Sequence, residues 1–269
     1  MNIFTVLITQ PLANGLIFFY HILGNNLGLA IIAFSLFLRI ILNPLTKPYM
    51  ESMKKMKDFA PEIDKLKKRH KDDKTKLAQA QADFYKDKGI NPSAGCLPYI
   101  LQIVILIALF RLFISVLSPD VDPIARLNEL LYQPLQFTQG QTLNENFLWL
   151  DLSRPDTIPV EGLPFALPGV LLFAAAGLQF LSAKITQPYI EQEEKMAKAT
   201  PDKSDDIATT MQASMVYTFP LMTLLIGLNF PSGLALYWLV FSAFQGFQQY
   251  RSSGWGGLTP WAKKLGIAK

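Results

Sequence analysis

Long apolar runs alternate with polar segments along most of this chain of 269 residues. A membrane-spanning helix needs about 20 consecutive apolar residues, with a range of roughly 17–25. Five stretches come close to this requirement, and we predict a transmembrane helix in each of them: residues 27–45, 97–117, 163–183, 211–228 and 233–250. The pattern therefore predicts an all-α polytopic membrane protein, with residues 1–269 forming a single domain.

The composition agrees with a membrane protein, since 50% of the residues are hydrophobic and only 17% are charged. Soluble domains carry about 25% charged residues. The single cysteine cannot form an intrachain disulfide. The two histidines, His21 and His70, have no metal-ligand spacing, and no HExxH or CxxC motif occurs. We therefore expect no disulfide framework, no metal site and no cofactor.

The positions of Lys and Arg predict the orientation of the helices, because cytoplasmic loops are enriched in these residues. Of the 25 basic residues, 13 lie in residues 47–88, and the segments 184–210 and 251–269 hold four each. The loop 118–162 holds only two. With spans of alternating direction, the N-terminus is outside and the C-terminus is cytoplasmic. Because no transit peptide is recognisable, we expect the bacterial plasma membrane.

Residues 1–26 form a weaker apolar stretch, which Pro11, Asn14 and Gly15 interrupt. A secretory signal would begin with positive charge and end at a small-residue cleavage site, but the first 38 residues contain no Lys or Arg. We interpret residues 1–26 as a helix that lies at the outer interface of the membrane. The alternative is a sixth span, which would place the N-terminus inside.

The charged segment 47–88 contains apolar residues at the 3.5-residue spacing that is typical of paired helices. The first part of this seam consists of Tyr49, Met53, Met56, Ile63 and Leu66, and the second part of Leu77, Gln81 and Phe84. Pro61 should interrupt the first helix after Ala60, and residues 70–74 should form the turn. We predict a cytoplasmic helical hairpin whose adaptable methionine face binds substrates or partners. A solvated loop beside anionic headgroups is the alternative.

The outer loop 118–162 has two further features. Residues 123–131 are amphipathic, and residues 147–150 form an aromatic edge that includes Trp149. Tryptophan is enriched at membrane–water interfaces. We interpret both features as architectural, with Trp149 as an interfacial anchor.

Arg39 lies inside the first predicted span, where an arginine costs about 2.5–3.5 kcal/mol on insertion scales. No predicted span contains an Asp or Glu to pair with it. One interpretation is that its side chain reaches the cytoplasmic headgroups. The other is a wet cavity, open to the cytoplasm, that attracts a negatively charged group. The polar residues available to line such a cavity are Gln102, Gln179, Ser182, Thr218, Thr223, Ser242 and Gln245.

Four stretches are similar, in this order, to the YidC family of membrane protein insertases, which includes the mitochondrial oxidase-assembly and thylakoid forms. They read NLGLAIIAFSLFLRIILNPL (26–45), NPSAGCLPYILQIVILIALFRLF (91–113), FLWLDLSRPD (147–156) and NFPSGLALYWLVFSAFQGFQQY (229–250). The resemblance implies a five-span core with a groove open to cytoplasm and lipid. By motif, Arg39 corresponds to the arginine that lies in the groove of family members. Gln102 and Trp238 correspond to the glutamine of the family's second span and the tryptophan of its last span. Val104 replaces a proline that the family often has.

The resemblance implies an insertase. An intramembrane enzyme is not expected, because neither histidine lies in one of the five predicted spans and no span carries a carboxylate. A nascent helix with an acidic tail would enter from the cytoplasm, be attracted by Arg39, and slide along Tyr237 and Trp238 into lipid without ATP. The partners implied are nascent membrane proteins and the bilayer, with the Sec translocon and the ribosome as candidates and no DNA. The alternatives are an assembly chaperone that acts only with a translocon and, less favoured, a small transporter, since paired repeats are missing.

Overall fold

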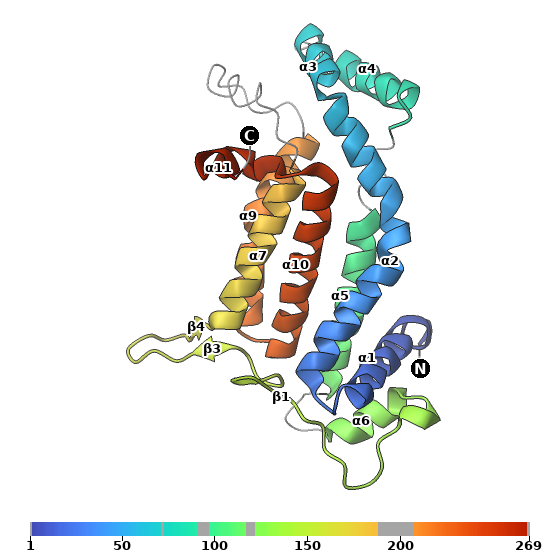
Figure 1. The fold of residues 1–269 in the computed structure, drawn as a ribbon, viewed down its shortest axis with the longest axis vertical. Helices are drawn as coiled ribbons and strands as arrows, with labels where there is room; N and C mark the ends of the chain where they lie inside the picture. The colour runs from blue at the N-terminus through green and yellow to red at the C-terminus, as the bar shows by residue number, and fades with distance from the viewer. Residues whose placement is uncertain (1, 71–72, 91–96, 117–121, 188–206, 268–269) are drawn as a thin grey trace. The chain divides into compact units, whose positions relative to one another are not determined.

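The computed structural model describes residues 2–70, 73–90, 97–116, 122–187 and 207–267, and helices dominate it (Figure 1). The main helices are α1 (Gln10–Ile22), α2 (Leu27–Asp58), α3 (Ala60–Arg69), α4 (Lys74–Asp87), α5 (Leu97–Val116), α6 (Pro123–Leu130), α7 (Val170–Thr186), α9 (Ile207–Gly227), α10 (Ser232–Ser253) and α11 (Thr259–Lys264). Shorter turns are the π-helical η1 (Thr5–Thr9) and the 3-10 helices η3 (Gln133–Leu135) and η4 (Gly256–Leu258).

The chain divides into two compact units. The first consists of Met1–Ile41, Gln102–Ser182 and Tyr217–Gly246. The second consists of Leu42–Leu101, Ala183–Val216 and Phe247–Lys269. Each unit is therefore assembled from three separate parts of the chain.

The N-terminal helical segment ends where the backbone turns through two left-handed residues. Gly24 has φ 72° and Asn25 has φ 57°, conformations that glycine and asparagine tolerate best. The side chain of Asn26 then accepts a hydrogen bond from the backbone N–H of Leu29 at 3.0 Å. This bond satisfies one of the N–H groups that a helix start leaves free, so α2 begins at Leu27.

The loop between α5 and α7 holds α1 in place through a buried amide in the first unit. Asn14 is only 5% exposed. Its Nδ2 donates to the carbonyl of Leu130 at 3.0 Å, and its Oδ1 accepts from the N–H of Tyr132 at 2.7 Å. The hydroxyl of Tyr20, which is 2% exposed, accepts from the N–H of Asn144 at 2.8 Å. The predicted amphipathic stretch 123–131 is helical up to Leu130, as α6, and is part of this contact.

The prediction that the third span begins as a helix at Leu163 is wrong. Residues from Leu163 onward were expected to be helical, but α7 begins only at Val170. Before it, β3 (Thr157–Ile158) pairs antiparallel with β4 (Leu167–Pro168). Pro164 and Pro168 explain the difference, because a proline inside a helix removes a hydrogen bond and clashes with the preceding turn.

The other span-like helices begin close to the predicted positions, but α2 is longer than expected. It runs from Leu27 to Asp58 without a break at Pro44, so the predicted start of a separate helix at Lys47 is wrong. A proline inside a long helix can kink it without ending it. The helical conformation is interrupted at Phe59, and Pro61 lies in the first turn of α3. A proline is tolerated there because the missing N–H would have no partner within the helix.

Many large apolar side chains point outward from the helices. They include Phe37, Ile40 and Ile41 on α2, Ile103 and Ile107 on α5, Val170 and Phe173 on α7, and Phe219 and Leu225 on α9. Soluble proteins keep such apolar surface small. The outward apolar faces therefore match a chain whose helices contact lipid.

Among the described residues, two stretches are long and apolar enough to cross a membrane, Thr5–Ile22 and Leu27–Pro44. Three shorter apolar helices follow, at Ile103–Val116, Val170–Thr186 and Ser214–Gly227. The helix α10 is in neither group, since polar residues such as Ser242, Gln245 and Gln248 lower its hydropathy. The count of five spans stays a prediction.

Candidate functional site

Arg39 contacts α10 within the first unit. Its guanidinium carbon lies 3.5 Å from the centroid of the Phe241 ring, which is the geometry of a cation–π contact. Its Nη2 donates to Oε1 of Gln245 over 3.4 Å, which is long for such a bond. Among the described residues, the guanidinium therefore contacts one aromatic face and forms one weak hydrogen bond.

The remaining hydrogen-bonding capacity of Arg39 is poorly used. An arginine carries five N–H donors and cannot lose its charge. Among the residues that the structure describes, no atom accepts a hydrogen bond from Nε, although that atom is buried, and none of the described ion pairs includes Arg39. A buried donor without an acceptor costs about 1–3 kcal/mol. Burial of this Nε therefore lowers the stability of the fold unless another group supplies an acceptor.

The contacts of Arg39 come from one face of α10. Tyr237, Phe241 and Gln245 are four residues apart, a spacing that places side chains on the same face of a helix. Tyr237 is 4% exposed, lies 6.0 Å from Phe241 between ring centroids, and interacts electrostatically with Arg39. Trp238 is half-buried on the next position of the helix, and the described contacts of Arg39 do not include it.

Gln179 and Thr223, which were also predicted to line the cavity, lie on α7 and α9 and bond to each other. Gln179 on α7 accepts a hydrogen bond from the hydroxyl of Thr223 on α9 at 2.7 Å, and Thr223 is 4% exposed. Thr218, also on α9, is exposed. Gln179 therefore has the interhelical bond that is the ordinary explanation for a polar residue in a membrane helix. Gln102 lies on α5, and its side chain is outside the described part of the structure.

The helical hairpin forms a small apolar core in the second unit. Ile63 on α3 and Leu77 on α4 are 7% and 8% exposed. The rings of Phe59 and Phe84 meet edge to face at 6.0 Å. Phe84 and Leu66 are half-buried, whereas the side chains of Met53 and Met56 lie outside the described part of the structure, so the binding face stays a prediction.

Polar contacts close the hairpin at both ends. The Nζ of Lys88 lies 4.8 Å from the centroid of the Phe59 ring and 3.8 Å from the carboxylate of Glu62. At the turn, Asp73 accepts a hydrogen bond from the backbone N–H of Lys76 at 3.0 Å and begins α4. That bond lowers the pKa of the exposed Asp73 carboxyl. These contacts explain why so charged a segment is ordered.

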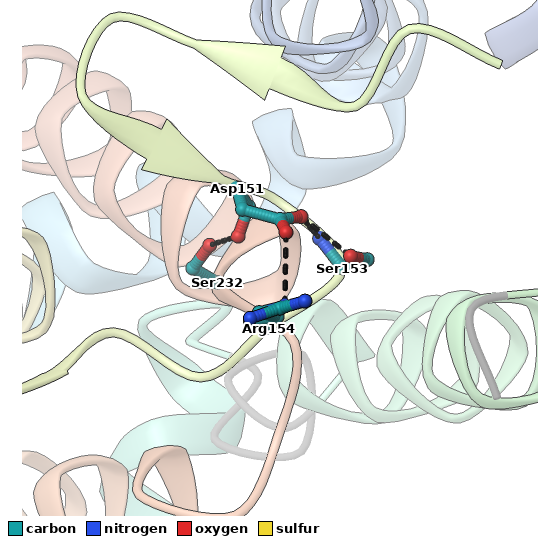
Figure 2. A network of polar contacts seen from close by, with 4 residues as sticks. All are labelled: Asp151, Ser153, Arg154 and Ser232. Carbon is teal, nitrogen blue, oxygen red and sulfur yellow. Dashed lines mark hydrogen bonds and ion pairs between the residues drawn. The ribbon is translucent and has the colours of Figure 1, made fainter. Parts of the chain in front are cut away.

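In the loop before α7, Asp151 forms a polar network with Ser153, Arg154 and Ser232 (Figure 2). Its carboxylate accepts hydrogen bonds from the N–H and the hydroxyl of Ser153, at 3.0 and 2.5 Å, and pairs with Nε of Arg154 at 3.1 Å. The hydroxyl and N–H of Ser232 donate to the carbonyls of Asp151 and Arg154 at 2.9 and 2.7 Å. The loop is thereby fixed to the first residue of α10.

Two other acidic residues of this loop, Asp156 and Glu145, differ in their surroundings. Asp156 accepts a hydrogen bond from the N–H of Leu172 at 2.8 Å and so caps α7 from a distant part of the sequence. Burial, followed by the charge of Asp151, raises the pKa of the Glu145 carboxyl, although a hydrogen bond with Ser153 acts in the other direction. Among the described residues, no group of three or more His, Cys, Asp or Glu side chains could hold a metal ion.

Sequence reasoning missed Phe241, which forms the closest described contact of Arg39. The sequence did contain a sign of this contact, because Phe241 lies four residues from both Tyr237 and Gln245 and so shares their face of the helix. An aromatic side chain in an apolar helix gives no other sign of a polar role. The partner of an isolated arginine could therefore be sought among aromatic as well as acidic residues.

Comparison with protein families gives a match over most of the chain. The model of a family described as 60Kd inner membrane protein matches residues 18–253. Proteins named membrane protein insertase YidC are 34% identical over 88% of this chain in Pelobacter propionicus and 36% identical over 92% in Pelagibacter ubique. The chain spans 36% and 39% of the length of these two relatives.

A relative of similar length carries the same name. The membrane protein insertase YidC of Fusobacterium nucleatum is 32% identical over 84% of this chain, and the match covers 85% of that relative. These matches confirm the resemblance seen in the four sequence stretches.

Proposed function

This chain belongs to the 60Kd inner membrane protein family, and from that premise we propose that it is a membrane protein insertase. It takes hydrophobic segments of nascent proteins from the cytoplasm and releases them into the lipid bilayer. The relatives named as insertases support this function. The observation that carries it in the structure is the cation of Arg39, which lies among apolar helices with no described ion-pair partner.

The proposed topology is five spans, with the N-terminus outside and the C-terminus in the cytoplasm of a bacterial plasma membrane. The distribution of Lys and Arg supports this orientation. In it, the hairpin formed by α3 and α4 and the tail after α10 are cytoplasmic, while the loop that contains Asp151 and Asp156 is outside.

The contacts of the N-terminal helix favour an interfacial position over a sixth span. Arg111 lies five residues before the outer end of α5, which corresponds to about 8 Å along the helix axis. The ring of Phe4 lies 5.2 Å from the Arg111 guanidinium, while Asn14 and Tyr20 bond to the outer loop. Both halves of the helix are therefore close to the outer surface, even though Thr5–Ile22 is long enough to span.

In the proposed mechanism, Arg39 receives the acidic tail of an incoming helix. A carboxylate can accept two hydrogen bonds from a guanidinium in a bidentate pair. The long bond to Gln245 is easily exchanged for such a pair, and the aromatic face of Phe241 keeps the guanidinium in place. The apolar segment then passes Tyr237 and Trp238 into lipid, driven by burial of apolar surface at about 25 cal/mol per Å².

We test the proposal by reconstituting the purified protein in liposomes and measuring protease protection of a single-span substrate with an acidic outer tail. Arg39→Ala should reduce protection about tenfold, equivalent to about 1.4 kcal/mol. Arg39→Lys distinguishes charge from guanidinium geometry, since lysine cannot form the bidentate pair. The matched control is Arg111→Ala, which removes an arginine of another apolar helix and should leave protection unchanged.

Two results would contradict the proposal. Equal protection with the Arg39→Ala and wild-type proteins would leave Arg39 without a role in insertion. A lack of protein-dependent protection, together with crosslinks to folded subunits, would favour an assembly chaperone that acts with a translocon. The same liposomes test the transporter alternative, which requires an ion flux that depends on Arg39.

A further inference from the structure

The last turn of α10 and the tail that follows it are basic and contain no acid. After Asp206 the chain has no Asp or Glu, whereas Arg251, Lys263, Lys264 and Lys269 are all basic. Each Lys or Arg near an anionic lipid surface contributes about 1 kcal/mol of attraction. The tail is therefore complementary in charge to the headgroups of anionic lipids.

The backbone of the tail is in close contact with the end of α7, within the second unit. A Cβ at Gly256 would overlap the carbonyl oxygen of Ile185, and one at Gly257 would lie 2.8 Å from the carbonyl oxygen of Lys184. Gly256 also has φ 48°, which favours glycine. The two glycines thus let the tail lie directly on the last turn of α7, and this contact fixes its position.

Two rows of apolar residues on the tail differ in their surroundings. Leu258 and Ala262, four residues apart, are 7% and 3% exposed. Trp261 and Leu265, also four residues apart, are 50% and 72% exposed, and Ile267 is 61% exposed. One row is covered by the protein and the other is accessible, so the tail presents an apolar edge beside Lys263 and Lys264.

Aromatic residues flank the point where the chain leaves α10. The rings of Tyr250 and Trp255 meet edge to face at 4.8 Å, and Tyr250 is 42% exposed. Tyr and Trp are enriched at membrane–water interfaces. Since α10 ends at Ser253, the amphipathic tail begins where a spanning helix would emerge from the bilayer.

We propose that residues 256–267 form an interfacial anchor that lies on the cytoplasmic leaflet and prefers anionic lipid. This inference rests on the proposed topology, in which the C-terminus is cytoplasmic. Trp261, Leu265 and Ile267 enter the boundary between headgroups and acyl chains, and Lys263 and Lys264 remain at the headgroups. Apolar and basic residues on one short helical segment are the combination that interfacial helices use.

The experiment uses the full chain in a Cys96→Ser background, since Cys96 is the single cysteine. A nitroxide label is attached at Leu265→Cys or, as the matched control, at the neighbouring Lys264→Cys. The accessibility of each label to oxygen, which concentrates in lipid, is compared with its accessibility to a water-soluble nickel chelate. The vesicles consist of neutral lipid with or without phosphatidylglycerol.

The ratio of oxygen to nickel accessibility should be severalfold higher at 265 than at 264, and higher at 265 when phosphatidylglycerol is present. Adding Lys263→Gln and Lys264→Gln to the Leu265→Cys protein should remove that dependence on phosphatidylglycerol. A label at 265 that the nickel chelate reaches freely in both vesicles, or that becomes protected only when ribosomes are added, overturns the proposal.

Insertion is measured in the same vesicles to separate this inference from the proposed function. Full insertion with a water-exposed label at 265 contradicts the anchor alone. A lipid-exposed label with no insertion contradicts the insertase function and supports the anchor.

Discussion

Two regions of the first unit differ in how completely their polar groups are hydrogen-bonded. Around Asp151 and Asp156, carboxylates and serine hydroxyls form short hydrogen bonds and an ion pair. Some of these bonds connect the loop to the first residues of α7 and α10. Around Arg39, a full charge has one 3.4 Å hydrogen bond and a buried Nε without a described acceptor. Satisfied polar groups stabilise a structure, whereas an unsatisfied one costs stability. The loop around Asp151 and Asp156 therefore stabilises the fold, whereas the contacts of Arg39 support the proposal that this residue binds substrate.

The largest expected effect is that of Gly169→Ala. A Cβ at Gly169 would overlap the carboxylate of Asp156, so the cap on α7 and the chain around it must move. Overpacking costs about 1–3 kcal/mol and a lost cap about 1 kcal/mol, and we expect a loss of about 3 kcal/mol, measured by thermal unfolding in nanodiscs.

The matched control for this change is Gly177→Ala on the same helix. No described atom lies within 4 Å of a Cβ at Gly177. Replacing glycine by alanine within a helix gains about 0.5–1 kcal/mol, so the control should raise the melting temperature slightly. A drop of equal size in both variants would mean that the contact between Gly169 and Asp156 does not determine the stability of α7.

Asp156→Ala should have a smaller effect. It removes the acceptor of the Leu172 N–H but leaves the backbone bond from Gly169 N to the carbonyl of Asp156, at 2.8 Å. Loss of a capping side chain costs about 0.5–2 kcal/mol. Asp156→Asn keeps an acceptor and should recover part of the loss. If both variants melt like the wild-type protein, the outer loop does not stabilise α7.

Arg39→Met tests the other side of the comparison. Replacing a poorly satisfied buried charge by an apolar residue of similar length is often neutral or stabilising. We therefore expect a change in unfolding free energy between about zero and +1 kcal/mol, together with a loss of insertion. A clear drop in the melting temperature would show instead that Arg39 is architectural, as Asp156 is.

Much of the helical pattern could be predicted from the sequence, because long apolar runs determine it locally. The prediction of a helix at 97–117 is close to α5, and the prediction at 233–250 is close to α10. The start of α7 could not be found this way, since Leu163 and Phe165 continue the apolar run although they precede a strand. The positions of Pro164 and Pro168 gave a local sign of the error, but the apolar pattern does not show that β3 pairs with β4.

The candidate site was predictable in part. Arg39 stands out because a charge is rare in an apolar run, and the amide of Gln245 was recognised as a polar group of the membrane helices. Phe241 was not, since the role of an aromatic residue depends on which helix lies opposite. The Asp156 cap was equally hidden, because its partner Leu172 is 16 residues away.

The smallest expected effect is a pH dependence at Glu145. Its carboxyl has a raised pKa because it is partly buried and near Asp151. The folded state therefore holds this proton at pH values where the unfolded chain has lost it, and stability falls as the pH rises between the unfolded and folded pKa values. Glu145→Gln removes this slope.

The Glu145→Gln protein should melt above the wild-type protein at neutral pH, and the difference should shrink as the pH falls through the folded pKa and on toward the unfolded one. The matched control is Glu129→Gln on α6, where the carboxylate is exposed and pairs with Arg126 at 3.2 Å. Its melting temperature should differ little from that of the wild-type protein, because exposed pairs contribute at most about 1 kcal/mol. Parallel curves for wild type and Glu145→Gln would mean that the fold accommodates the charged form of Glu145 as well as the unfolded chain does, and that the contrast with Arg39 extends to this carboxylate too.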